Sequence, residues 1–442
     1  MQISPRVPAR VTSDPPGHDA AVGSHPGATP DTSLDHRVLG RDLGIYDTHE
    51  LAGAGFPLWL PDGAAIIAEL ERYILDAERR AGYRHVRTPP VGKRELYERS
   101  GHWAHFSADM FPLMPVGGDE LVLRPTLCPH HALVFGSRLR SHRELPLRLA
   151  EFGQQFRMER SGVVSGLTRV RGMILDDAHV FCAPDQGAEE VALVLRMIDE
   201  AYVTLGIRPA YAMLSLRGPG KSYAGSDAMW AKAEEILRTA ADLHGLELRP
   251  AEGEAAFYGP KIDIQVYDAG GREFTLSTAQ VDLYQPERFD LSYVAPSGDR
   301  VRPVIVHRSV LASMERMVAY LLESSGGALP PWLAPLQVLV LPVGEEQAAY
   351  AWEIAARARQ AGLRVEVDDR GETLSARIRA ASERKVPYVA IVGSREEDAH
   401  AVSVRLRGDR AAARQPMAMP RFVDAVRSVV EARTREVTLA SH

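Results

Sequence analysis

Apolar residues first recur at helical spacing between Leu58 and Ala81. Pro61-Asp62-Gly63 supplies a helix start and Gly82 a helix end. The residues that share one face are Ile66, Leu70, Tyr73 and Ile74. This spacing predicts a mostly helical segment whose apolar face packs on a core.

The middle of the chain alternates apolar and polar residues, as half-buried strands do. In KIDIQVYD the alternating sets are Ile262, Ile264 and Val266 against Asp263, Gln265 and Tyr267. Ala269-Gly270-Gly271 predicts a turn into a second extended stretch, REFTLSTAQVDLY. RLAEFGQQFRME and RPVIVHRS indicate further strands, and a helix expected after the latter carries Val310, Met314, Met317 and Leu321. The pattern predicts an antiparallel sheet flanked by helices.

The pattern changes after Leu329-Pro330-Pro331-Trp332. Strand-like PLQVLVLPV, an Ala-rich helix ending at Gly362 and strand-like LRVEVDD come first. A helix carrying Leu374, Ile378 and Ala381 and strand-like VPYVAIVG follow. The β-α-β-α-β order predicts a separate small α/β domain over 333–435. Residues 1–34 have no hydrophobic period and are rich in Pro, Gly and Ser, so we expect a disordered tail.

Composition narrows the class of protein. The 442 residues are 45% hydrophobic and 25% charged, which is ordinary for a soluble globular protein. No apolar stretch is long enough to span a bilayer and no secretory leader is visible, so we expect a cytoplasmic protein. Only two cysteines occur, which excludes a disulfide scaffold. The net charge of −6 argues against indiscriminate nucleic-acid binding but not against a local basic surface.

Two arginines are candidates for phosphate binding. Arg157 and Glu159 are two apart in FRME at a strand end, so both would face one ligand, the Arg as a fork for phosphate and the Glu as an acceptor. Arg316 lies near a helix start, where N–H groups and the dipole also favour anions. Taken singly, a surface ion pair and an Arg lying along a helix are the simpler explanations of these residues.

Cys128, His179 and His307 form a candidate metal set. One thiolate and two imidazoles suit zinc, and three protein ligands leave a position open for substrate. The three residues are far apart in sequence, so a structural histidine is the simpler explanation of His179 or His307 alone, and a small buried hydrophobic residue that of Cys128. In DDAHVFC, Asp177 and His179 are two apart and face one side of a strand, whereas Cys182 faces the other and is expected in the core.

A family resemblance then unites these residues. Several segments resemble, in order and spacing, those of the threonyl-tRNA synthetase family, which are class II aminoacyl-tRNA synthetases. They are DHRVLGRDL, RELYERSGHW, RPTLCP, LPLRLAEFGQQFRMERSG, GLTRVRGMILDDAHVFC, GSDAMW, AFYGPKIDI, HRSVLASMER and WLAPLQV. The resemblance runs from Asp35 to Arg435, about nine-tenths of the chain. It implies an α+β catalytic domain over 35–330, with the class II antiparallel sheet and flanking helices. A small α/β anticodon-binding domain follows over 333–435.

The resemblance also implies roles for individual residues. The reaction would consume L-threonine and ATP with Mg²⁺ and charge tRNA(Thr), with one Zn²⁺ per subunit on Cys128, His179 and His307. The catalytic and ATP-binding residues would be Arg157, Arg316, Glu159, Arg169 and Met173. The threonine contacts would be Asp177 for the hydroxyl, Tyr258 for the amino group, and Gln280 and Lys261. The anticodon contacts would be Arg379, Glu396 and Arg405. Pro89 marks a motif that forms a two-fold interface, so a homodimer is expected.

Several positions depart from the family pattern. Leu175 stands where a Gln is expected to hold the substrate carboxylate, and a leucine can neither donate nor accept a hydrogen bond. The other departures are Met173 for a Phe, Thr275-Leu276-Ser277 for Gln-Cys-Gly, Ala312 for a Gly, Ser165 for a His, and Gly371 for an Asn. These changes leave open whether the pocket reflects inhibitor resistance, a new substrate or drift.

The sequence therefore predicts a threonine–tRNA ligase. The family's N-terminal and editing domains have no counterpart ahead of the match, so we expect no clearance of seryl-tRNA by this chain. An alternative is activation of threonine or another β-hydroxy amino acid for a carrier protein or other non-tRNA acceptor. A non-catalytic RNA-binding regulator is a third possibility, which the retained motifs oppose.

Overall fold

The computed structural model describes residues 34–409 and 416–439. The tail predicted for residues 1–34 lies outside the described residues except for Leu34. Within those two ranges no helix is long and apolar enough to cross a membrane.

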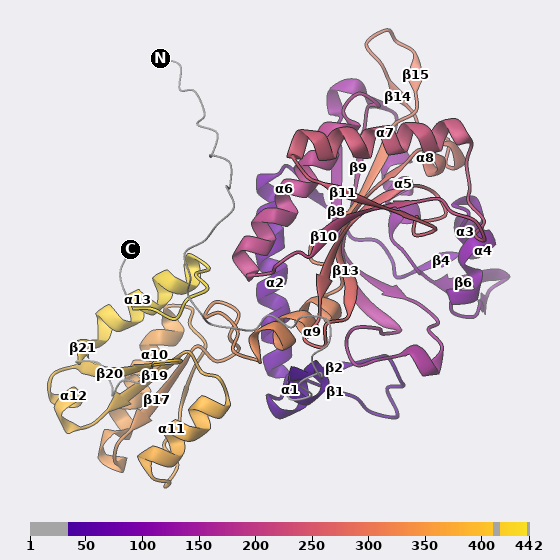
Figure 1. Ribbon diagram of the computed structural model, residues 1–442. Helices are drawn as coiled ribbons and strands as arrows, with labels where there is room; N and C mark the ends of the chain where they lie inside the picture. The colour runs from indigo at the N-terminus through magenta and orange to yellow at the C-terminus, as the bar shows by residue number, and fades with distance from the viewer. Residues whose placement is uncertain (1–33, 410–415, 440–442) are drawn as a thin grey trace, which may run out of the picture.

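An eight-stranded sheet forms the centre of the larger part of the molecule (Figure 1). In spatial order its strands are β11 (Leu248–Glu252), β10 (Tyr211–Leu216), β12 (Lys261–Tyr267), β13 (Glu273–Asp282), β16 (Val304–Ser309), β9 (Gly172–Cys182), β8 (Leu147–Phe156) and β3 (Arg84–His85). Neighbours are antiparallel except β10–β11 and β3–β8, which are parallel. The predicted antiparallel sheet and the β12–β13 hairpin are confirmed.

The two faces of this sheet differ in chemistry. Ala178, Val180 and Cys182 of β9 point into the main core, where α6 (Gly187–Leu205) and α7 (Asp227–His244) cover the sheet. The alternate residues lie on the opposite face. There the sheet is polar yet buried, since Asp263 and Gln265 are 1% and 2% exposed. A buried polar face needs partners or a ligand, which makes this side the place to look for a site.

Helix boundaries differ slightly from the sequence pattern. Within the mostly helical segment predicted over 58–81, helix α2 spans Pro61–Arg80 and begins at the predicted start signal Pro61-Asp62-Gly63. Leu58 belongs to β2 (Leu58–Trp59), which pairs with β1 (Tyr46–Asp47). Helix α9 spans Met314–Ser325, so Val310 precedes it. The Ser313 hydroxyl accepts a hydrogen bond from the Arg316 N–H at 3.2 Å and caps α9.

Shorter elements complete this part of the chain. The helices are α1 (His36–Asp42), α3 (Arg94–Arg99), α4 (His102–Phe106), α5 (Cys128–Gly136) and α8 (Tyr284–Arg288). Two three-stranded sheets combine β4 (Val91–Lys93), β6 (Asp119–Leu123) and β5 (Met114–Val116), and β15 (Arg300–Val301), β14 (Tyr293–Val294) and β7 (Arg140–Ser141).

The C-terminal part has its own sheet and core (Figure 1). Its strands in spatial order are β18 (Val365–Val367), β17 (Val338–Pro342), β19 (Tyr388–Val392), β20 (Ala401–Leu406) and β21 (Met417–Ala418). Helices α10 (Ala348–Gln360) and α13 (Met419–Glu431) pack on one face, α11 (Leu374–Glu383) packs on the other, and α12 (Ser394–Asp398) precedes β20. The predicted β-α-β-α-β order is confirmed, and the antiparallel β20 and β21 extend it.

Helix α2 joins the two parts. The Arg433 guanidinium donates to Asp76 of α2 at 2.6 Å and lies 5.1 Å from the ring centroid of Tyr73 on the same helix. Arg364 pairs with Glu69, one further residue of α2. These contacts fix the C-terminal sheet against the larger body.

Candidate active site

Cross-strand register brings four of the predicted site residues into one row. Lys261 of β12 is the partner of Gln280 on β13, and Gln280 is the partner of His307 on β16. His307 is in turn the partner of His179 on β9. Paired residues point to the same face, so the row lies on the polar side of the sheet.

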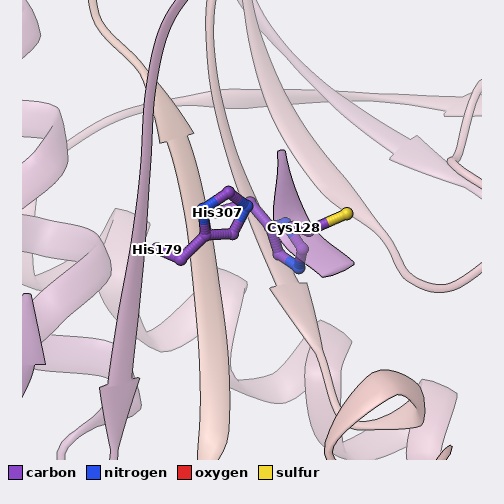
Figure 2. A group of neighbouring side chains, drawn as sticks. All are labelled: Cys128, His179 and His307. Carbon is purple, nitrogen blue, oxygen red and sulfur yellow. The ribbon is translucent and has the colours of Figure 1, made fainter. Parts of the chain in front are cut away.

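Cys128 completes a compact group with the two histidines. Cys128 is the first residue of α5. Its sulfur, one ring nitrogen of His179 and one of His307 all lie within 4.8 Å of one another. All three side chains are buried, and Figure 2 shows them side by side. Burial raises the pKa of the Cys128 thiol and lowers the pKa of His179 well below its usual value. A neutral imidazole is the form that binds a metal.

Hydrogen bonds fix which nitrogen each histidine offers. His131 approaches Glu151 through Nε2 at 3.4 Å, and its Nδ1 lies 2.8 Å from Nδ1 of His179. Donation from His131 to the carboxylate makes its Nδ1 an acceptor for His179, so Nε2 of His179 keeps a free lone pair. Nε2 of His307 lies 3.0 Å from Asp282, which leaves Nδ1 of His307 free in the same way. Metal-ligating histidines have such outer partners, so this donor set fits a divalent ion.

Asp177 and Tyr258 lie beside this group. Asp177 Oδ2 accepts a hydrogen bond from Gln155 Nε2 at 3.1 Å, and burial raises the pKa of its carboxyl. The Tyr258 ring stacks on His307 with centroids 5.1 Å apart, and its hydroxyl donates to Gln280 Oε1 at 2.7 Å. Lys261, at the end of this row, pairs with Asp263 and does not line the cavity.

A cavity of about 200 Å³ extends from the Cys/His group to two arginines. Arg157 and Arg316 both line it, and Met173 and Leu175 lie between them and Asp177. The pKa of Arg316 is lowered by burial and by the nearby charges of Arg157 and Arg169. Within the cavity wall the Arg316 side chain donates to a carbonyl, that of Thr275, at 3.1 Å. Clustered cations of this kind favour an anionic ligand.

Four buried polar atoms of residues that line this cavity have no hydrogen-bond partner in the described structure. They are Gln155 Oε1, Arg157 Nε, Arg308 Nε and Ser309 Oγ. Leaving a buried polar atom unpaired costs roughly 1 to 3 kcal/mol. Arg308 is already held by Glu78 and Asp176, so the other three atoms indicate that a polar ligand pairs with them.

The strand-face argument for Arg157 and Glu159 is wrong. Strand β8 ends at Phe156, and the Glu159 N–H donates to the Arg157 carbonyl at 2.8 Å in a turn. The Glu159 carboxylate instead accepts from Arg169 Nε at 2.9 Å. Neither Glu159 nor Arg169 lines the cavity, although the loop that holds both, residues 157–171, borders it.

Five of the positions that depart from the family pattern line this cavity, whereas Ser165, Ser277 and Gly371 do not. Met173, Leu175, Thr275, Leu276 and Ala312 line it, and Leu276 is the extra residue of a β-bulge opposite the Ile264–Gln265 step of β12. Ser277 is buried and donates to the Val310 carbonyl. Cys182 is in the core, as predicted, with its thiol 3.8 Å from the Val304 carbonyl.

Sequence reasoning missed His131, Gln155 and Asp282. His131 follows Cys128 by three residues on α5, so helical spacing alone could have indicated one shared face. Gln155 lies on β8 opposite Met173 of β9, and because β8 ends at Phe156 strand spacing does not relate it to Arg157. Asp282 ends β13 and had no local signal.

The three predicted anticodon residues lie on one side of the C-terminal sheet. Arg405 of β20 is the partner of Val389, which packs with α11, the helix that carries Arg379. Glu396 accepts from Ser403 Oγ at 2.8 Å, and Ser403 is two residues from Arg405 on the same strand. Hydrogen bonds from Ser403 and the Gly393 N–H hold the pKa of Glu396 below its usual value although burial raises it.

Comparison with known proteins agrees with this architecture. Residues 114–325 match the tRNA synthetase class II core domain (G, H, P, S and T), and residues 337–428 match an anticodon binding domain. A solved prolyl-tRNA synthetase from Cryptosporidium parvum, at 16% identity, shares the fold with a TM-score of 0.68. Fold and matches together define a class II aminoacyl-tRNA synthetase core.

Closer relatives specify the family. The threonine–tRNA ligase of Halalkalibacterium halodurans is 50% identical over 85% of this chain, and that of Geobacillus kaustophilus is 49% identical over 85%. A crystal structure titled as the RNA binding domain of threonyl-tRNA synthetase from Cryptosporidium parvum has a TM-score of 0.85 at 35% identity. It is covered over 98% of its length, and 89% of this chain is matched. The chain belongs to the threonyl-tRNA synthetase family. It spans 59% and 58% of the length of the two bacterial ligases.

Proposed function

We propose that this protein activates L-threonine with ATP and transfers the threonyl group to the 3′ end of tRNA(Thr). The observation that carries the proposal is the arrangement of one cavity. It has a Cys/His₂ group and Asp177 at one end and two clustered arginines at the other. A small polar amino acid and a polyphosphate would therefore meet inside it.

The arginines suit the first chemical step. Attack of the threonine carboxylate on the α-phosphate of ATP forms a mixed carboxylic–phosphoric anhydride, the threonyl-adenylate, and breaks the α–β phosphoanhydride bond, which releases pyrophosphate. Negative charge accumulates on the phosphate oxygens during this step, and the guanidiniums of Arg157 and Arg316 stabilise it. The carboxylate is already ionised, so these residues need no general base. Mg²⁺ would accompany ATP as part of the substrate.

We propose Cys128, His179 and His307 as the ligands of one Zn²⁺. When bound, zinc would supply a Lewis-acid centre for the amino and hydroxyl groups of threonine. Asp177 beside it would accept a hydrogen bond from the hydroxyl, and Tyr258 would contact the amino group. A site that binds a hydroxyl discriminates strongly against valine, whereas rejecting serine for one missing methyl is worth only about 1 to 3 kcal/mol.

The C-terminal domain supports tRNA as the acceptor. We propose that Arg379, Glu396 and Arg405 contact anticodon bases, which are unpaired and can be read on their edges. The proposed domains are 35–330 for catalysis and 333–435 for anticodon binding, and a homodimer is proposed on the family pattern around Pro89. A synthetase-like enzyme with a non-tRNA acceptor would have no use for this surface.

Pyrophosphate exchange tests the activity. Purified protein is assayed for ATP–pyrophosphate exchange with threonine, serine, valine and larger β-hydroxy amino acids, then for acylation of total tRNA. We expect threonine to support the fastest exchange, serine slower exchange and valine almost none, with threonine charged onto tRNA(Thr). Exchange without charged tRNA would instead support the non-tRNA acceptor, and no exchange would contradict activation altogether.

Metal content tests the zinc proposal separately. We expect Cys128→Ala to lose both bound zinc and threonine-dependent exchange. Retained stoichiometric zinc in this variant would show that the ligand set is wrong. His131→Phe keeps all three ligands but breaks the hydrogen bond to His179, and outer-partner loss typically lowers metal affinity about 10- to 100-fold. The matched control is His130→Phe, because His130 contacts the Val91 carbonyl instead.

A further inference from the structure

His36 lies at the junction of three segments that are far apart in sequence. It is the first residue of α1 and is 2% exposed. Its Nδ1 is 2.6 Å from Oε1 of Glu323, near the end of α9. Its Nε2 is 3.1 Å from the backbone N–H of Leu167, in the loop between β8 and β9.

These two contacts assign both ring nitrogens. A backbone N–H can only donate, so Nε2 must be the acceptor. The proton therefore sits on Nδ1, which donates to the Glu323 carboxylate. The Glu323 carboxylate also accepts from the His36 backbone N–H at 3.2 Å and from the Ala269 N–H at 3.4 Å, so it holds the ring from a fixed position.

The loop is shaped to receive this ring. Residues 165–169 form a tight turn closed by two backbone hydrogen bonds between Ser165 and Arg169, at 3.1 and 3.3 Å. Leu167 at its tip is fully buried. Gly166 has φ +48°, and a Cβ atom there would lie 2.2 Å from Nε2 of His36. Only glycine allows the ring to approach the turn so closely.

Arg169 is the residue whose placement depends on this turn. It closes the turn, two residues after Leu167, and its side chain is 55% exposed. Its Nε donates to Glu159 on the opposite limb of the loop at 2.9 Å. The turn therefore fixes the position of the Arg169 backbone, from which the guanidinium extends. His36 fixes the position of this turn.

We propose that His36 is a positioning residue for ATP, holding the turn so that Arg169 meets the polyphosphate. This inference rests on the proposed function, in which ATP binds at Arg157 and Arg316. Arg169 does not line the cavity, but it lies near enough for its charge to act on Arg316 in the cavity wall. A displacement of about 1 Å in such a contact is enough to cost a large part of its benefit.

Two variants break the contact from opposite sides. His36→Asn keeps a donor for Glu323 but has no atom at the place of Nε2, so the Leu167 N–H loses its acceptor. Gly166→Ala keeps the histidine and pushes it away. The matched control is His244→Asn, which removes another histidine–carboxylate hydrogen bond, to Asp199 at 2.8 Å on the far side of the sheet.

Amide hydrogen exchange reports on the contact without any activity. We expect faster exchange at the Leu167 amide in His36→Asn and Gly166→Ala, and unchanged exchange in His244→Asn. In pyrophosphate exchange we expect the KM for ATP to rise about tenfold in both variants, with the KM for threonine within about twofold of wild type. Equal rises in both KM values would indicate a merely structural role and overturn the proposal.

A double mutant tests the route through Arg169. If His36 acts by placing Arg169, then His36→Asn raises the KM for ATP in the wild-type background but adds little in an Arg169→Ala background. Additive effects would overturn the proposal, as would unchanged Leu167 protection in His36→Asn. Wild-type protein without any exchange activity would contradict the proposed function, whereas the hydrogen-exchange result would still decide whether His36 holds the turn.

Discussion

Ala312 carries a backbone conformation that disfavours its side chain. It has φ +57°, in the left-handed region, directly before the cap of α9. The family pattern has glycine at this position, and the dihedral angle gives the reason, since glycine adopts positive φ without a steric penalty. The alanine lines the cavity, so its methyl group also occupies space beside the substrate.

Ala312→Gly should therefore stabilise the protein. Removing the left-handed strain raises the free energy of unfolding. The net gain is about 1 kcal/mol, because glycine also gives the unfolded chain more conformational entropy. Urea denaturation measures it. The same change at Ala380, in the middle of α11, should destabilise by about 1 kcal/mol, because a helical φ gives glycine no advantage there. Two changes of the same sign would contradict this explanation.

Glu315 makes stability depend on pH. Burial raises its pKa from 4.5 to about 7 despite the hydrogen bond from the Ile174 N–H. Its pKa is higher in the folded than in the unfolded chain, so folding takes up a proton between those values. The free energy of unfolding should thus fall as pH rises from about 4.5 to 7, by on the order of 3 kcal/mol.

Glu315→Gln should remove this dependence. The amide stays neutral and can still accept from Ile174, so the variant should match wild type near pH 5 and exceed its stability at pH 8. Denaturation midpoints at the two pH values measure the difference. A constant gap between the proteins across this range would show that the carboxyl does not titrate there.

The orientation of individual site residues could be predicted only where it depends on local periodicity, such as the alternation of side chains along a strand. Alternation along a strand predicted that Asp177 and His179 share one face of β9 and that Cys182 lies on the other, and the structure confirms both. Arg157 and Glu159 failed by the same rule, because β8 ends one residue before Arg157. The spacing of His131 from Cys128 indicated a shared helix face but not the contact with His179, and Asp282 had no signal because its partner His307 lies on another strand.

At the level of elements, a buried charge cluster joins β16 to β9 and α2. The Arg308 guanidinium pairs with Asp176 on β9 and Glu78 on α2, and all three side chains are at most 2% exposed. Asp176 Oδ2 also accepts the N–H groups of Val310 and Leu311 at 2.9 Å. His307 immediately precedes Arg308, so this cluster also fixes the segment that carries a proposed metal ligand.

Arg308→Leu should strongly destabilise the fold. It leaves two carboxylates buried without their cation, which typically costs about 3 to 5 kcal/mol. Arg384→Leu is a suitable comparison, because it breaks a pair with Glu366 whose side chains are 43% and 51% exposed and should cost no more than about 1 kcal/mol. Thermal or urea unfolding of the two variants measures the contrast, and similar losses would contradict it.

Periodicity predicted the long elements better than their boundaries. The helix from Pro61, the β12–β13 hairpin and the first three strands of the C-terminal sheet all follow from it. Strand β2, just before α2, was not predicted, because Leu58 pairs with β1 and a local pattern cannot contain such a tertiary contact. The buried polar face of β12 was equally invisible, since alternation fixes which residues share a face but not what covers it.

For the whole molecule, the two proposed recognition surfaces should be separable. Arg405→Ala should lower kcat/KM for tRNA in acylation about tenfold, because a base-edge contact is worth roughly 1 to 3 kcal/mol, while pyrophosphate exchange stays unchanged. Arg427→Ala on α13, which packs on the opposite face of the sheet, is the control and should leave both unchanged. A loss of exchange in Arg405→Ala would show that the residue does not act on tRNA alone.

Helix α2 links these distant surfaces mechanically. Glu69 and Asp76 hold the C-terminal domain, and Glu78, less than one turn further, holds Arg308 beside His307. One 20-residue helix, about 30 Å long, thus contacts both halves of the molecule. Any rotation of the C-terminal domain must either break its ion pairs with α2 or move this helix, and with it Arg308 in the wall of the proposed active-site cavity.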